Sequence, residues 1–232
     1  MKGITIGNKH TYRDWDCFMG KETSISFPDI KQTTIDVPGS DNVIDLTETL
    51  TGNVNYKTRK IKIVLYTIKK TKNWEEYISR ISNYLHGKRL KIIFDEDPSF
   101  YYEGRCELNP LDVDANVGKI IIDVEADAYK YCINSTVEDW IWDSFNFEKG
   151  IIQELYDLQV NGNLELDLYN LKMKVSPIII ASNDMEIEFN SETYKIYKGE
   201  NEMLDIEFVE GLNKIKIIGN GIISIEYRGG SL

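Results

Sequence analysis

Apolar and polar residues alternate in short runs along most of the chain, and turn-forming residues separate the runs. A period of two places successive side chains on opposite faces of a strand, so the pattern predicts half-buried antiparallel strands. The longest such stretch, residues 90–131, contains strand-like segments around a polar loop at 95–99 and an aromatic run at 100–102. The predicted fold class is therefore mainly β.

Two further patterns in the first half also indicate strands. Short extended segments at 35–37 and 43–47 flank Pro38-Gly39, a pair that favours a tight turn because proline fixes one dihedral and glycine supplies a positive one. Residues 56–66 alternate apolar and basic side chains, as expected for a strand with one face in water.

One helix is predicted in the first half, between Asn73 and Gly87. Asn73 suits the N-cap, Glu76 completes a capping box, and Gly87 suits the stop. Apolar residues recur at helical spacing, so one face should pack against a sheet. His86 lies in the last turn, where we interpret it as a cation that complements the helix dipole.

The second half contains a regular series of short alternating segments separated by Asn, Gly or charged turns, a spacing typical of a β-sandwich of about 100 residues. The predicted strands are 164–168, 176–180, 185–189, 194–197, 203–208, 213–218 and 222–227.

Charge separates the two halves of the 232-residue chain, whose net charge is −11. Residues 1–133 carry 19 basic and 20 acidic side chains, whereas residues 134–232 carry 8 and 18. We therefore predict two domains, 1–133 and 134–232. An aromatic-rich segment at 136–148 is interpreted as a strand or an interdomain linker. The acidic total argues against nucleic-acid binding, which requires a basic surface.

The three cysteines, Cys17, Cys106 and Cys132, have neither metal-site nor disulfide spacing, and we expect buried free thiols. No signal-peptide core and no membrane-spanning run is present, which predicts a protein made in a reducing cytoplasm. The sequon Asn134-Ser135-Thr136 has no predicted role without secretion.

Candidate chemistry is sparse. The cluster Asp95-Glu96-Asp97 could supply paired carboxylates for glycoside hydrolysis, but consecutive residues before a proline fit a solvated loop better. The run from Asp112 to Gly118, with Asp123 at the twelfth position, is similar to a calcium loop, but its glycine is misplaced. His10 and His86 are too isolated for a triad or a metal site. We predict no enzyme, metal or cofactor.

Tyrosines in the second half suggest an alternative function. Exposed aromatic rings on a β-sandwich can stack on sugars. The second half offers Tyr169, Tyr194, Tyr197 and Tyr227. The main candidates for glycan stacking are Tyr194 and Tyr197, although half-buried packing residues give the same pattern. The alternative is thus a carbohydrate-binding protein that recognises cell-wall glycan.

The order of these segments resembles the distal tail protein (Dit) family of phages and prophages. The resemblance covers nearly the whole chain and departs from the family at residues 134–162 and in the acidity of the last domain. The matching features are the Val37-Pro38-Gly39 turn, the helix ending at Leu85-His86-Gly87, the motif with Asp97, Pro98, Tyr102, Gly104 and Arg105, the strand closing on residues 128–131, and the segments 210–215 and 219–230.

The resemblance implies an N-terminal β domain with one α-helix and a projecting hairpin, followed by a galectin-like or carbohydrate-module-like C-terminal β-sandwich. It also implies a non-enzymatic virion protein of the tail tip, assembled in the host cytoplasm. A hexameric ring would join the tail tube protein to the tail-tip protein and to a receptor-binding protein, without nucleic acid or membrane partners.

Within the motif at 97–105 we expect an architectural role. Gly104 should meet a backbone constraint, Tyr101 and Tyr102 should face opposite sides of a strand, and Arg105 should pair with a nearby carboxylate.

Overall fold

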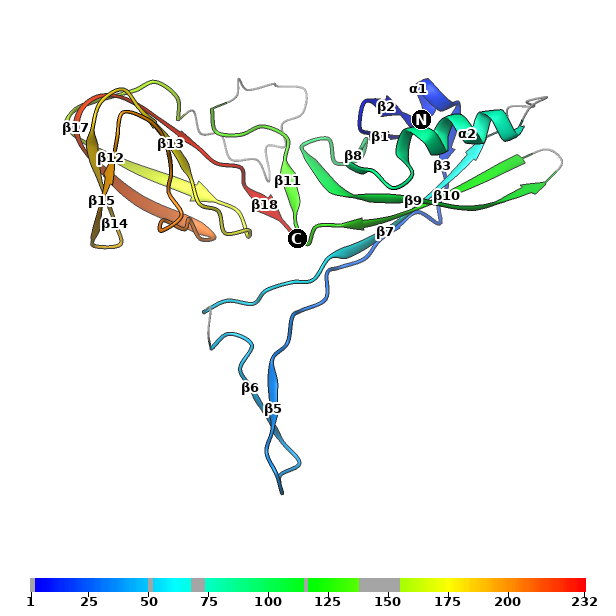
Figure 1. Ribbon diagram of the computed structural model, residues 1–232, viewed down its shortest axis with the longest axis horizontal. Coiled ribbons are helices and arrows are strands. Elements are labelled where there is room, and N and C mark those ends of the chain that lie inside the picture. The colour runs from blue at the N-terminus through cyan, green and yellow to red at the C-terminus, as the bar shows by residue number, and fades with distance from the viewer. Residues whose placement is uncertain (1–2, 50–51, 68–73, 115–116, 138–154) are drawn as a thin grey trace. The chain divides into compact units, whose positions relative to one another are not determined.

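The computed structural model describes residues 3–49, 52–67, 74–114, 117–137 and 155–232, with the backbone alone at 110–114 and 117. The chain divides into two compact units. The first comprises Met1–Glu96 and Tyr102–Ala128, and the second comprises Asp97–Tyr101 and Tyr129–Leu232. Strands dominate both units, so the predicted mainly β class is confirmed (Figure 1).

The first unit is built on one large antiparallel sheet. Its elements are β1 (Ile4–Ile6), β2 (Lys9–His10), α1 (Thr11–Trp15), β3 (Cys17–Met19), β4 (Ser24–Ile25), β5 (Thr34–Asp36), β6 (Val43–Asp45), β7 (Arg59–Thr67), α2 (Trp74–Leu85), β8 (Arg89–Phe94), most of β9 (Phe100–Asp114) and β10 (Val117–Ala126). The main strand order is β2-β1-β8-β9-β10-β7-β3, and β4 also pairs with β7. The predicted strand around residues 56–66 is confirmed as β7, which alternates buried Ile61, Ile63 and Leu65 with exposed lysines.

The predicted helix is confirmed as α2. Its residues Tyr77, Ile81 and Leu85 are buried in the core that the inner face of the sheet completes. Gly87 ends the helix with φ of 75°, a left-handed conformation that glycine adopts without the steric cost of a Cβ. Asn73, the predicted N-cap, lies outside the described residues.

The first unit contains a second, shorter helix that the sequence analysis missed. His10 caps α1 because its Nδ1 accepts hydrogen bonds from the backbone N–H groups of Tyr12 and Arg13, both at 3.2 Å. Histidine is not among the residues that commonly signal an N-cap, which explains the omission. The prediction of a single helix was therefore wrong.

The second unit contains a six-stranded antiparallel sheet, formed by β12 to β17. The strands of the whole unit are β11 (Lys130–Cys132), β12 (Leu158–Asn170), β13 (Ile178–Ala181), β14 (Met185–Phe189), β15 (Glu192–Ile196), β16 (Gly199–Glu202), β17 (Gly211–Glu226), β18 (Gly230–Ser231) and the start of β9. The sheet order is β15-β14-β17-β13-β16, with β12 on the other side of β17. Its core includes Phe208, Ile217 and Ile225, all fully buried.

Two strand predictions in this unit were wrong. Segments 213–218 and 222–227 belong to one strand, β17, which runs through Gly219-Asn220-Gly221 and pairs with β12 along its length. Residues 203–208 form no strand, although Met203, Ile206 and Phe208 are buried and Phe208 makes an isolated bridge with Val175. Burial of apolar side chains thus occurs here in an irregular segment, and the strand that pairs with β13 is the preceding β16.

A small sheet extension lies at the start of β9, within the second unit. Tyr131 of β11 pairs with both Tyr101 and Gly230, so the chain end is tied to the start of β9 through β11. The Tyr101 and Tyr131 rings are 5.4 Å apart, and Arg228 lies over the Tyr101 ring. The predicted aromatic segment at 136–148 lies largely outside the described residues.

Candidate functional site

The first unit carries a two-stranded hairpin whose strand residues are all exposed. Strands β5 and β6 pair through Ile35 and Ile44, and Figure 1 shows the ribbon extending away from the main sheet of the first unit. The Val37 carbonyl accepts from the Ser40 N–H at 3.0 Å, and Gly39 has φ of 81°, as in a type II turn with Pro38 at its second position. The predicted strand–turn–strand is confirmed.

Apolar side chains are exposed along this hairpin and the segment that leads to it. The exposed large apolar residues are Ile25, Phe27, Ile30, Ile35, Val37, Val43 and Ile44. Phe27 is 84% exposed and Val43 is 53% exposed. Isolated two-stranded hairpins are marginally stable in water, and contiguous exposed apolar surface commonly marks a binding site. We call residues 25–46 the hairpin arm and treat it as the main candidate interaction surface.

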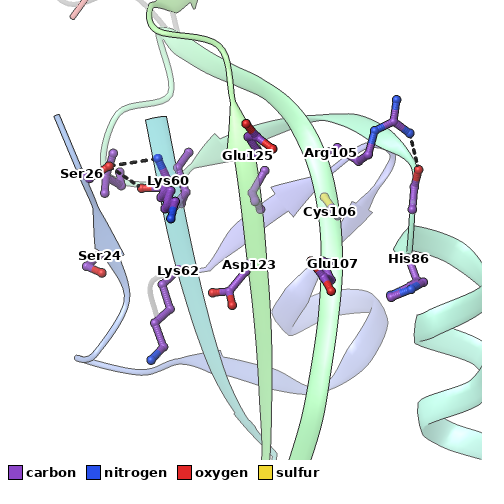
Figure 2. Close-up of a pocket in the computed structure, with 14 residues that line it drawn as sticks. Ser24, Ser26, Lys60, Lys62, His86, Arg105, Cys106, Glu107, Asp123 and Glu125 are labelled. Atoms are coloured by element: carbon purple, nitrogen blue, oxygen red, sulfur yellow. Dashed lines mark hydrogen bonds between the residues drawn. The ribbon is translucent and has the colours of Figure 1, made fainter. Parts of the chain in front are cut away.

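The opposite character appears on the outer face of the main sheet, which Figure 2 shows from β4 to β9. Register places Lys60 beside Glu125 and Lys62 beside Asp123. On the far side of β10, Glu125 lies beside Arg105. Cross-strand neighbours of opposite charge attract, and the alternation leaves this shallow, polar face near neutral. Such a face can take part in polar contacts with another protein surface.

The motif at 97–105 makes turn, ion-pair and close backbone contacts. Asp97 begins a turn in which the Phe100 N–H donates to the Asp97 carbonyl at 3.2 Å, with Pro98 in the second position. The Asp97 carboxylate accepts from Lys130 Nζ at 2.6 Å. A Cβ on Gly104 would lie 2.7 Å from Ala126 Cα and from the Glu125 carbonyl oxygen, so the expected backbone constraint is confirmed.

The two tyrosines of this motif serve different units. Tyr101 packs on Tyr131 in the second unit, whereas Tyr102 packs edge-on against Phe94 in the core of the first. Arg59 also lies over the Tyr102 ring. Because successive strand residues face opposite sides, one strand supplies both contacts, as expected.

Two predicted side-chain roles at the end of α2 were wrong. Arg105 donates through Nη1 to the Gly87 carbonyl at 2.6 Å, and none of its described hydrogen bonds joins a carboxylate. His86 accepts through Nδ1 from the Leu108 N–H at 3.0 Å, and a nitrogen that accepts cannot carry the proton of a cation. Arg105 and Lys88, which donates through Nζ to the Asn83 carbonyl at 3.0 Å, therefore place positive charge at this helix end.

The carboxylate cluster at 95–97 does not converge on one bond. Asp95 accepts from the Gly3 N–H at 2.7 Å and contacts His10 Nε2 at 3.2 Å, within the first unit. Asp97 instead pairs with Lys130, within the second unit. Both carboxylates thus hold backbone or side-chain partners in the manner of a structural loop.

The calcium-like run coincides with the β9–β10 hairpin. Asp112 and Asp114 belong to β9, and their side chains lie outside the described part of the molecule. Asp123 is in β10, where its carboxylate accepts from Asn109 Nδ2. Within the described residues, no group of three or more His, Cys, Asp or Glu side chains could hold a metal ion.

The tyrosines proposed for glycan stacking differ in exposure. Tyr194 packs against the core and donates to Glu192 at 2.6 Å, whereas Tyr197 is 63% exposed. Tyr169 is 49% exposed, and its carbonyl accepts from the buried Tyr227 at 2.8 Å. Two of the four rings are therefore open to water, which is the exposure that stacking on a sugar requires.

All three cysteines are free thiols, as predicted. Cys17 and Cys106 are buried and Cys132 is half-buried. Burial disfavours the thiolate and raises the pKa of each to about 11. Cys17 also contacts Tyr77 Oη at 3.0 Å, and Tyr77 donates to the Trp15 carbonyl. These thiols therefore have the character of packing residues.

Comparison with known proteins rests on the fold. No protein-family model matches the sequence, and a search of curated protein sequences finds no match. Among solved structures, the Dit protein (gp 19.1) of SPP1 matches with a TM-score of 0.67 over 98% of this chain and 99% of that chain. The two sequences are 13% identical.

The chain has the fold of a phage Dit protein. The SPP1 Dit protein has been described as a paradigm of the hub adsorption apparatus in phages that infect Gram-positive bacteria. The resemblance drawn from the order of segments is thus confirmed as a Dit-like fold. The sequence patterns did not identify the hairpin arm as an interaction surface. Its signal in the sequence is the presence of apolar residues on both short strands that flank Pro38-Gly39.

Proposed function

We propose that this chain is a non-enzymatic hub of a phage or prophage tail tip. The observation that carries the proposal is the end-to-end match to a Dit fold, which includes both units of the chain and leaves almost no part of either protein unmatched. Neither described helix is long and apolar enough to cross a membrane.

The proposed assembly is a hexameric ring that joins the tail tube protein to the tail-tip protein and to a receptor-binding protein. The ring-forming part is proposed to be residues 1–133, and residues 134–232 are proposed to form a galectin-like sandwich. The near-neutral first part supports this division, since like charges on the acidic second part would repel when crowded.

The hairpin arm supports self-association. A ring of identical subunits closes through contacts between two different surfaces of neighbouring copies. The arm offers an apolar surface that one copy leaves in water, and the outer face of the main sheet offers a polar one. Burial of the arm against a neighbour would remove its exposed apolar side chains from water.

Multi-angle light scattering of the purified chain tests this proposal. A hexamer of 26.8 kDa subunits has a mass of 6 × 26.8, about 161 kDa. We expect that mass for the chain alone, or a larger mass when a hexamer has bound its tail tube or tail-tip protein. A mass of one subunit under both conditions would overturn the ring.

A further inference from the structure

The outer face of the second unit carries a stripe of isoleucines. Ile178 and Ile180 of β13 point away from the core, because their neighbours Ile179 and Ala181 are buried. Ile222 of β17 lies opposite Ser182, the next residue after Ile180 on this face, since the Ser182 N–H donates to the Ile222 carbonyl at 2.9 Å. Ile180 is 42% exposed and Ile222 is 41% exposed. Strand geometry therefore holds β-branched side chains together in water.

Carboxylates flank this isoleucine stripe. Glu202 of β16 and Glu226 of β17 are the cross-strand neighbours of Ile178 on its two sides. Glu200 of β16 is the neighbour of Ile180. Neighbours in register have Cβ atoms about 5 Å apart, so the acids border the apolar side chains directly. None of the ion pairs among the described residues uses these three glutamates.

Several outward carboxylates elsewhere in the second unit pair with lysines. Glu188 accepts from Lys216 at 2.9 Å, and Glu207 accepts from Lys174 at 2.9 Å. The isoleucine stripe thus differs in combining exposed apolar area with uncompensated negative charge. The stripe also lies next to β16, which is the last strand in the order of the sheet and so has an edge that can pair with a further strand.

We propose that this face, formed by β13, β16 and the end of β17, docks an extended basic and apolar segment of another protein. A strand added at the β16 edge would place every second side chain on the face that carries the glutamates. Lysines or arginines at those positions would lie beside Glu200 and Glu202, and their apolar stems would extend toward the isoleucines of β13. Charge complementarity disfavours the hairpin arm of a second copy as the occupant, because residues 25–46 contain four aspartates and one lysine. The proposal does not depend on the ring.

A dye-labelled octapeptide of alternating isoleucine and lysine is the probe, and fluorescence anisotropy with the full chain is the measurement. Two patch variants are compared with wild type: Glu200→Lys with Glu202→Lys, and Ile180→Ser with Ile222→Ser. The matched control is Glu165→Lys with Glu186→Lys, which changes the net charge equally at exposed strand positions of the same unit. Circular dichroism verifies that each variant is folded.

We expect saturable binding to the wild type, weakened about tenfold or more by each patch variant and less than about twofold by the control. Binding to the wild type should also weaken as salt is added. Absent saturable binding, or a control that loses as much affinity as the charge variant, would overturn the proposal. In that case the glutamates only protect an edge strand from aggregation.

Discussion

At the scale of single residues, backbone geometry could be predicted better than side-chain partners. Gly39 and Gly104 were expected to meet backbone demands, and both do, because a turn and a crowded strand pairing exclude other residues. Arg105 was expected to find a carboxylate, but it donates to the carbonyl of Gly87. A long flexible side chain reaches many acceptors, and the sequence does not state which one the fold brings near.

Gly104→Ala should destabilise the first unit. The new methyl group would lie 2.7 Å from backbone atoms of Glu125 and Ala126, which can move only if β9 and β10 separate locally. Overpacking of this kind costs about 1–3 kcal/mol. Hydrogen exchange of peptides from β9 and β10 should become faster, whereas the control Gly229→Ala, whose nearest neighbours are 3.5 Å away, should exchange as wild type.

Stability should fall at high pH because of the buried thiols. Their pKa in the folded chain is about 11, against 9.0 for an ordinary cysteine. The folded state therefore holds protons that the unfolded state releases, so stability is full below pH 9 and is lost as pH rises toward 11. Urea unfolding between pH 8 and 10.5 should show this decrease, and Cys106→Ala should lessen it. An unchanged pH slope in that variant would contradict the assignment.

At the scale of elements, periodicity identified most of the strands and α2, because burial on one face is a local property of the sequence. It failed at residues 203–208, where an irregular segment buries three apolar side chains, and at β17, where two predicted strands are one. It also missed α1, whose N-cap is His10. The ring of His10 is held by the carboxylate of Asp95, which follows β8 and is distant in sequence. These errors share a cause, since each depends on contacts distant in sequence.

The hairpin arm should determine self-association. Ile35→Ser combined with Ile44→Ser removes two exposed apolar side chains that do not belong to the core cluster of the first unit. We expect a monomer with unchanged thermal stability in light scattering. Tyr197→Ser, which removes a comparably exposed side chain from the second unit, should leave the assembly intact. An arm variant that assembles like wild type would remove the arm from the interface.

At the scale of the whole molecule, the order of segments predicted the Dit-like fold better than any single motif. The core of the first unit lies between Ile4 and Ala126, and that of the second lies between Leu155 and Tyr227. In the sequence, the two parts differ in charge, because residues 1–133 are near neutral and residues 134–232 are acidic. It gave no indication that residues 97–101 belong with the second unit, because this depends on pairing with β11.

The proposed second domain should fold alone. Every member of its core cluster lies within residues 134–232, although the fragment loses the β11 partner of β18. We expect cooperative thermal unfolding and dispersed amide resonances for the fragment 134–232. A fragment 129–232 serves as the comparison, because it restores β11. Random-coil spectra from both fragments would contradict an independent domain.

The central claim is that this chain is a ring-forming hub of a phage tail. Electron microscopy of the purified chain, alone and mixed with its tail tube and tail-tip proteins, tests it most directly. We expect class averages of a closed ring with six-fold symmetry. Isolated single subunits in every mixture, with no particle bound to either tail protein, would contradict it.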